Sequence, residues 1–205
     1  MLGAETVFRT SQIVNAYYTY ALTATPRRSD GKDILIEAGS GPVVVIDTDQ
    51  NLIQNGYVLP VEINIYGFNH SKSYKDIYTA YRRLIVNNQK RNEQIANIVK
   101  SLNKKTLVLV KYIKHGEILS QLLGVPFVHG KSSSEERIKN LEAFTKGDLN
   151  ILIASDIFKQ GIDIPECEAL VLAHAGSSEI SVMQKIGRVR RPGNNKEHAL
   201  IIDFY

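Results

Sequence analysis

The sequence predicts an α/β protein built on a parallel sheet with helices on both faces. Between residues 61 and 204, short apolar runs alternate with longer segments of helical periodicity. This alternation is typical of strand–helix–strand units, which produce parallel sheets. The apolar runs, such as TLVLV at Thr106–Val110, are continuous, as expected for strands that helices cover on both sides. We expect about six strands in one sheet, with ligands beyond the carboxyl ends of the strands.

Glycines and prolines mark where the elements of this part end. Gly124 and Gly147 follow amphipathic segments and are typical helix C-caps, and Pro192 stops a third segment. The predicted strands are Val61–Tyr66, Thr106–Val110, Pro126–His129, Ile151–Ala154, Ala169–Ala173 and Ala199–Phe204. The predicted helices lie within Ser73–Leu102, interrupted near Asn87-Asn88, and at Gly116–Leu123, Ser134–Lys146 and Ser178–Arg191.

The first fifty residues do not follow the same alternation. They predict a helix over Glu5–Tyr17, strands at Tyr18–Thr23 and Val43–Ile46, and a polar, glycine-containing stretch between these strands. We therefore predict three segments. They are a fragment of a preceding domain at 1–50, a linker at 51–59 and the sheet domain at 60–205.

Composition excludes several classes of protein. Apolar residues make up 43% and charged residues 22%, which is typical of a soluble globular protein. No apolar run approaches the roughly 20 residues of a membrane helix, and the N-terminus has no secretory signal. The single cysteine, Cys167, excludes an internal disulfide, and its spacing from the histidines predicts no metal site. The net charge of +4 suits a polyanionic partner. We expect an intracellular protein, cytoplasmic or nucleoid-associated.

The helix predicted at Ser178–Arg191 carries two contrasting faces. Gln184, Arg188 and Arg191 are spaced four and three apart, so they share one face. The opposite stripe consists of Val182, Ile186 and Val189. Planar arginine forks bind phosphate oxygens and can stabilise the charge that develops during phosphoryl transfer. A solvated basic face with ordinary surface ion pairs is the alternative interpretation.

A second candidate site follows the predicted strand Ile151–Ala154. Ser155 comes directly after this strand, and the stretch Gly161-Ile162-Asp163-Ile164-Pro165 follows six residues later. A hydroxyl and exposed backbone N–H groups at the carboxyl end of a strand can bind a phosphate. Gly161 allows a sharp turn, and Asp163 can accept a hydrogen bond from a ribose hydroxyl. An ordinary turn with a capping aspartate would have the same composition.

Taken together, these stretches resemble a known family. ILIASDIFKQGIDIP, from Ile151, and QKIGRVRR, from Gln184, resemble motifs V and VI of superfamily 2 helicases. ALTATPRR at Ala21–Arg28 resembles motif III in the restriction-enzyme-like and repair-helicase branches, and TLVLVK stands where motif IV belongs. VHGKSSSEERIKNLEAFTKGDLN, from Val128, resembles the segment that joins motifs IV and V. The resemblance covers nearly the whole chain and implies a RecA-like sheet of the P-loop NTPase fold, specifically the helicase C-terminal lobe.

The resemblance also implies roles for individual residues. Arg188 and Arg191 would act as arginine fingers at the γ-phosphate of ATP, with Gln184 close by. Gly161 and Asp163 would lie near the sugar of ATP. The nucleic-acid strand would contact Ser155, the turn Gly130-Lys131-Ser132, and Lys111. Motif III would couple the ATP state to the nucleic-acid cleft through Thr23 and Thr25.

The complete protein would bind ATP and Mg²⁺ through a G-x-x-x-x-G-K-[ST] loop and an acidic pair, which this sequence does not show. The stretch GVPFVHGKS, from Gly124, has one residue too many between its glycines and contains a predicted strand. In the family an acidic motif precedes a stretch like Gly3–Thr6. We therefore expect the chain to begin just after that motif, to bind no cofactor tightly and to hydrolyse no ATP alone.

The predicted function is that of the C-terminal lobe of an ATP-dependent DNA helicase or translocase, which supplies arginine fingers to ATP held by a missing first lobe. The alternative is a non-catalytic RecA-like module that binds nucleic acid or a protein partner. The expected partners are DNA, with RNA as the alternative, and the missing first lobe. We expect no membrane partner. Self-association through the exposed strand Tyr18–Thr23 is a further expectation, because an unpaired strand edge can pair between chains.

Overall fold

A six-stranded sheet forms the centre of the computed structural model, which describes residues 5–14, 16–23, 31, 33–44, 46–69, 73–155, 167–176, 179–193 and 196–205. The strand order is β1-β6-β5-β2-β4-β3, and every neighbouring pair is parallel. The strands are β1 (Val61–Tyr66), β2 (Thr106–Val110), β3 (Phe127–Val128), β4 (Ile151–Ser155), β5 (Ala169–Leu172) and β6 (Ala199–Phe204). The predicted fold class is thereby confirmed.

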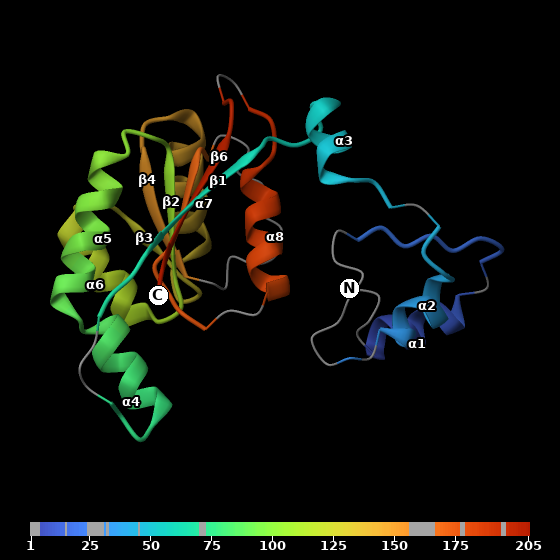
Figure 1. Ribbon diagram of the computed structural model, residues 1–205, viewed down its shortest axis with the longest axis horizontal. Helices are drawn as coiled ribbons and strands as arrows, with labels where there is room; N and C mark the ends of the chain where they lie inside the picture. Colours follow the sequence, from blue (N-terminus) through green and yellow to red (C-terminus); the bar gives the residue numbers. More distant parts are fainter. Residues whose placement is uncertain are drawn as a thin grey trace.

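Helices cover both faces of this sheet (Figure 1). Helices α5 and α6 lie on one side of the sheet, and α7 and α8 on the other. The helices of this part are α4 (Ile77–Tyr81), the π-helix η1 (Arg82–Val86), α5 (Gln89–Ser101), α6 (Ile113–Leu123), α7 (Ser134–Lys146) and α8 (Glu179–Val189). The short α4 projects beyond the end of the sheet.

Local side-chain chemistry sets several of these boundaries. The Asn88 side chain accepts a hydrogen bond from the backbone N–H of Arg91 and begins α5, while the Ser133 hydroxyl accepts one from Glu136 and begins α7. Helices α6 and α7 end at Gly124 (φ 72°) and Gly147 (φ 90°), as predicted. These left-handed conformations favour glycine because a side chain there meets its own backbone.

The strands alternate between two hydrophobic clusters. Leu152 and Ala154 of β4 pack on the side of α7 and α8, whereas Ile153 packs on the side of α5 and α6. All three are 0% exposed. Burial on both faces explains why the strands read as unbroken apolar runs.

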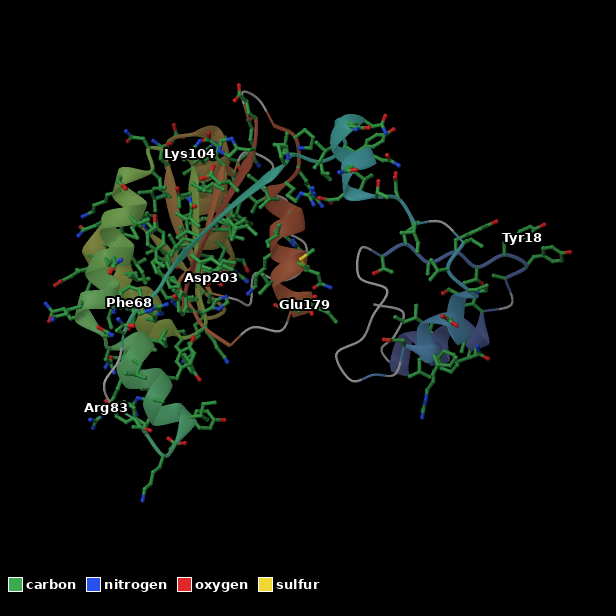
Figure 2. All side chains as sticks on the ribbon, in the orientation of Figure 1. Tyr18, Phe68, Arg83, Lys104, Glu179 and Asp203 are labelled. Carbon is green, nitrogen blue, oxygen red and sulfur yellow. The ribbon has the colours of Figure 1, made fainter. Side chains whose placement is uncertain are left out.

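Residues 5–48 have a different character. They contain α1 (Glu5–Ile13) and α2 (Ile34–Ser40), which contact each other. The next helix, α3 (Asp49–Gln54), begins two residues before the predicted linker at 51–59 and covers the first residues of that linker. None of the described side chains before α3 is buried. Figure 2 shows Tyr18 pointing away from the rest of the chain, and this side chain is 70% exposed.

Several predictions for this part were wrong. The described residues of Tyr18–Thr23 and Val43–Ile46 form no strand, α1 ends four residues before Tyr17, and α2 was not predicted. A strand is defined by pairing with a neighbour, and neither stretch has one among the described residues. The expectation of self-association through a strand at Tyr18–Thr23 therefore loses its structural basis. Over the described residues, no helix has the length and apolar character needed to span a bilayer.

Candidate functional site

Helix α8 separates the two stripes that the sequence predicts. Ile186 and Val189 are buried (8% and 3% exposed) and Val182 packs beside them against the sheet. On the other side, Gln184 is exposed and Arg188 is half-buried. The helix ends at Val189, two residues earlier than predicted, so the exposed Arg191 lies just beyond it. The structure thus brings the amide and the first arginine onto one side of α8, with the second arginine at its end.

The C-terminal end of α8, which carries Arg188 and is followed by Arg191, lies at the end of the sheet where the strands begin. Helix α8 leads from β5 back to β6, and in Figure 1 it ends near α3 and the start of β1. The backbone N–H of Leu59, two residues before β1, donates to the carbonyl of Arg190 (2.8 Å). The Lys196 ammonium donates to the carbonyls of Val189 and Arg191. A cation at this position is favourable because helix carbonyls carry partial negative charge at the C-terminus.

The residues predicted to contact nucleic acid lie together at the opposite end of the sheet, where the strands finish. Val110 of β2 and Val128 of β3 pair with Ser155 and Ala154 of β4. Because these three parallel strands are neighbours, the residues that follow them meet at one edge of the sheet. This edge receives Lys111, Ser155 and the turn Gly130–Ser132, which were predicted separately from the sequence.

The turn after β3 is built by its own side chains. The backbone N–H of His129 donates to the Ser132 hydroxyl (3.3 Å), and the N–H of Lys131 donates to Nδ1 of His129 (3.2 Å). Ser132 is therefore buried within the turn, at 8% exposure, whereas Gly130 and Lys131 are exposed. Of the three, Lys131 is the side chain that the turn presents to solvent.

Lys111 and Ser155 contribute differently to the same edge. The Lys111 ammonium lies over the rings of Tyr81 (5.5 Å) and Tyr112 (6.0 Å), which hold it beside the strand ends. Ser155 is 2% exposed, and its hydroxyl has no hydrogen-bond partner among the described residues. A buried hydroxyl without a partner costs free energy, so Ser155 favours an incoming polar group.

Comparison with known proteins identifies the fold family. The family described as "Helicase conserved C-terminal domain" matches residues 89–193, which run from α5 to the end of α8. The chain belongs to this family. The resemblance to superfamily 2 helicases is thereby confirmed for the C-terminal helicase domain.

Three relatives extend the similarity beyond the matched domain. "Putative DNA 3'-5' helicase Rad25" of Halobacterium salinarum is 32% identical and covers 92% of this chain, and 32% of its own length is matched. "Putative helicase 22" of a Sulfolobus islandicus filamentous virus is 29% identical over 89% of this chain and 36% of its own length. "ATP-dependent DNA helicase uvsW" of Enterobacteria phage T4 is 28% identical over 95% of this chain and 41% of its own length. The chain therefore spans about a third to two fifths of the length of these relatives.

The structure of T4 UvsW shares the fold. It superimposes with a TM-score of 0.55 at 24% identity, covering 71% of this chain and 32% of the UvsW chain. Its identity is too low to carry residue roles, so this likeness concerns the arrangement of helices and strands.

The predicted site residues differ in whether the structure describes them. Gly161, Asp163 and Thr25 lie outside the described residues, so their roles stay predictions. Thr23 is described and exposed. No group of three or more histidine, cysteine or acidic side chains in the described part of the chain is arranged to hold a metal. The stretch from Gly124 to Ser132 begins at the C-cap of α6 and contains the whole of β3, a geometry unlike that of a phosphate-binding loop.

The sequence analysis did not predict that two positively charged side chains near these candidate sites are buried. Lys185 of α8 is 8% exposed, and its ammonium hydrogen-bonds Nε2 of His174 (2.8 Å), which is also buried. A signal was available, because Lys185 lies three residues after Val182 and four before Val189, which places it within the apolar stripe. Burial of a lysine requires a polar partner, and His174 supplies it.

The sequence did not reveal the burial of Arg91 of α5 either. It is 1% exposed, donates to the carbonyl of Ala173 (2.9 Å), and stacks on Phe68 and Phe204. Desolvation lowers its pKa to about 10. This cation ties α5 to the carboxyl ends of β5 and β6, the edge that also carries Lys111.

His115 of α6 lies in the same buried region. Its Nε2 faces the Asn92 side-chain oxygen at 3.0 Å, and its Nδ1 has no partner among the described residues. Burial, with added repulsion from Arg91 and His174, lowers the pKa of His115 to about 3. The imidazole is therefore neutral near pH 7.

Proposed function

We propose that the chain is the C-terminal ATPase lobe of an ATP-dependent DNA helicase or translocase. It presents Gln184, Arg188 and Arg191 to ATP held on another lobe, and it contacts DNA with the opposite edge of the sheet. The observation that carries this proposal is α8, whose apolar side packs into the core while Gln184 and Arg191 are exposed and Arg188 is half-buried. The relatives named as DNA helicases support the choice of DNA, and UvsW supports ATP.

The chemistry of the ATP side follows from charge. Arg188 and Arg191 each offer several N–H donors in a plane and stay protonated at any working pH. Such donors stabilise the negative charge that spreads over a transferring phosphoryl group. In this proposal the other lobe holds ATP and Mg²⁺, because the sequence shows no G-x-x-x-x-G-K-[ST] loop. By itself the chain supplies the arginines.

The proposed contacts with nucleic acid are made to its sugar–phosphate backbone. Lys131 and Lys111 neutralise phosphates, and the Ser155 hydroxyl offers a hydrogen bond. Such contacts are independent of base sequence and release counterions, so binding weakens as salt rises. Opening and closing of two lobes during ATP turnover would move this edge relative to the other lobe.

The ATP side is tested by titrating the full chain with Mg-ATP and following the amide resonances of α8 by NMR. We expect shifts centred on Gln184 and Gly187, lost in Arg188→Ala and Arg191→Ala, while Arg137→Ala of α7 serves as the matched control. We expect ATP hydrolysis by the full chain to stay at background. Turnover that Arg188→Ala abolishes would contradict the proposal of a separate ATP-holding lobe.

The nucleic-acid side is tested by fluorescence anisotropy with a labelled single-stranded DNA. We expect binding that falls steeply between 50 and 200 mM salt, on the order of tenfold for two or more phosphate contacts. Lys131→Ala should weaken it about threefold, and Lys139→Ala on the outer side of α7 should not. DNA binding without any response to Mg-ATP would favour the non-catalytic module instead.

A further inference from the structure

Between the two proposed arginine fingers in sequence lies a third arginine, Arg190. All three guanidinium nitrogens of Arg190 donate hydrogen bonds within the chain. Its Nη1 and Nη2 donate to the two carboxylate oxygens of Asp49 (2.7 and 2.8 Å), and its Nε donates to the carbonyl of Leu59 (2.9 Å). The Arg190 side chain is 12% exposed. A bidentate pair of this kind fixes the relative orientation of its partners as well as their distance.

The backbone completes the connection. Leu59 donates from its N–H to the carbonyl of Arg190 and accepts from the Arg190 side chain at its own carbonyl. Two residues that are far apart in sequence therefore exchange two hydrogen bonds at the end of α8. We call the contacts among Asp49, Leu59 and Arg190 the α8 clasp.

The segment that the clasp holds is itself folded. Thr48 caps α3 by accepting from the N–H of Asn51, which places Asp49 in the first turn of the helix. After Gly56, at φ 71°, the chain turns back, and the N–H of Tyr57 donates to the carbonyl of Leu52 (2.9 Å). Residues 49–59 thus form a compact unit, so a displacement of α3 is passed to the end of α8 instead of being absorbed by a loose chain.

Arg188 and Arg191 flank the clasped residue in sequence. We propose that Arg190 is a positioning residue, which with Asp49 as its anchor couples the position of segment 49–59 to the orientation of the Arg188–Arg191 end of α8. The function of this end rests on the proposed function above. The segment before β1 then sets how the arginines are presented, and α3 moves together with them.

The effect of breaking the clasp is confined to one edge of the sheet. Asp49 is 64% exposed, so the ion pair by itself contributes modestly to global stability. The residues proposed to contact DNA lie at the other end of the strands. A positioning role therefore predicts a change at α8 without a matching change in DNA binding.

The test compares hydrogen exchange and Mg-ATP response in four variants of the full chain. Asp49→Asn removes the charge with little change of shape. Arg190→Lys keeps the charge and removes the fork. The double variant Asp49→Arg with Arg190→Asp restores an ion pair in reverse. Glu142→Gln, which breaks the exposed Glu142–Lys146 pair of α7 (3.3 Å), is the control.

We expect the amides of Leu59 and Arg190 to exchange about threefold to tenfold faster in Asp49→Asn and Arg190→Lys. We expect partial recovery in the reversed pair and no change in Glu142→Gln. The Mg-ATP response of α8 should weaken about threefold in the first two variants, while DNA affinity stays within twofold of the unchanged chain. Unaltered exchange, equal losses of Mg-ATP response and DNA affinity, or no recovery in the reversed pair would overturn the proposal.

Failure of the clasp and failure of the proposed function give different results. If Arg188→Ala leaves the Mg-ATP response unchanged, the function assigned to the arginine face is wrong, and the exchange rates at Leu59 and Arg190 still decide whether the clasp orders the end of α8. If Arg188→Ala removes the response but Asp49→Asn alters neither exchange nor response, the function holds and the clasp has no positioning role.

Discussion

Two regions of this chain contain similar numbers of apolar side chains per length and use them differently. Between Val61 and Phe204 the apolar runs pair into a sheet and fill two buried clusters. In residues 5–48 the side chains of Tyr17 and Leu22 are 91% and 98% exposed. The difference shows that an apolar run becomes a strand only where a neighbouring strand and a covering helix receive it.

The largest expected contrast is in core packing. Leu152→Ala, in β4, should lower the free energy of unfolding by about 2–5 kcal/mol, because it removes buried methyl groups and leaves a cavity between the sheet and α7. Leu22→Ala should change it by less than about 0.5 kcal/mol, because that side chain is already in water. Urea unfolding followed by circular dichroism measures both. Equal effects would mean that residues 5–48 share the core of the sheet.

The second contrast concerns pH, because the region between Val61 and Phe204 contains buried titratable side chains and no described side chain of residues 5–48 is buried. The folded pKa of His115, about 3, lies below its ordinary 6.5. Between these values the unfolded chain binds one more proton, so stability is full above pH 6.5 and falls as the pH is lowered, by up to about 1.4 kcal/mol per pH unit. His115→Gln should flatten this slope, and His198→Gln at the surface should not. An unchanged slope in His115→Gln would assign the acid sensitivity to other groups.

A pair of glycines gives a smaller and matched contrast. Gly124 ends α6 and Gly41 ends α2, both with positive φ (72° and 81°), and an added Cβ would meet nothing at either position. Alanine at Gly124 should therefore cost about 1 kcal/mol of global stability through backbone strain alone. The same change at Gly41 should weaken α2 locally and leave the main urea transition in place. A shift of that transition by Gly41→Ala would show that α2 unfolds together with the sheet.

The smallest effect is expected from removing the first region. A chain that starts at Asp47 keeps α3 and the α8 clasp, and its unfolding free energy should match that of the full chain within about 0.5 kcal/mol. A chain that starts at Leu59 loses Asp49, and its Arg190 amide should exchange faster. Light scattering on both compares self-association. A large loss of stability in the chain starting at Asp47 would contradict the contrast from which these predictions start.

The sequence by itself determined the class of fold and most elements of the sheet domain. Continuous apolar runs fixed Thr106–Val110 and Ala199–Phe204, and capping residues fixed the ends at Gly124 and Gly147, because these signals act within a few residues. The opposed stripes of α8 were predictable for the same reason. The sequence also predicted Lys111, Ser155 and Lys131 as nucleic-acid contacts, but it did not predict that they lie close together.

Only the tertiary structure decided how these pieces meet. Because β4 lies between β2 and β3, Lys111, Ser155 and Lys131 lie together where these strands finish. Helix α8 runs back from the end of β5 toward the start of β6, so its arginines lie at the opposite end of the sheet. Burial of Arg91 and Lys185, and the ion pair of Arg190, depend on the partners Ala173, His174 and Asp49. Strand pairing, the burial of a charged side chain and the α8 clasp all depend on groups that are distant in sequence. A pattern of neighbouring residues therefore does not predict them.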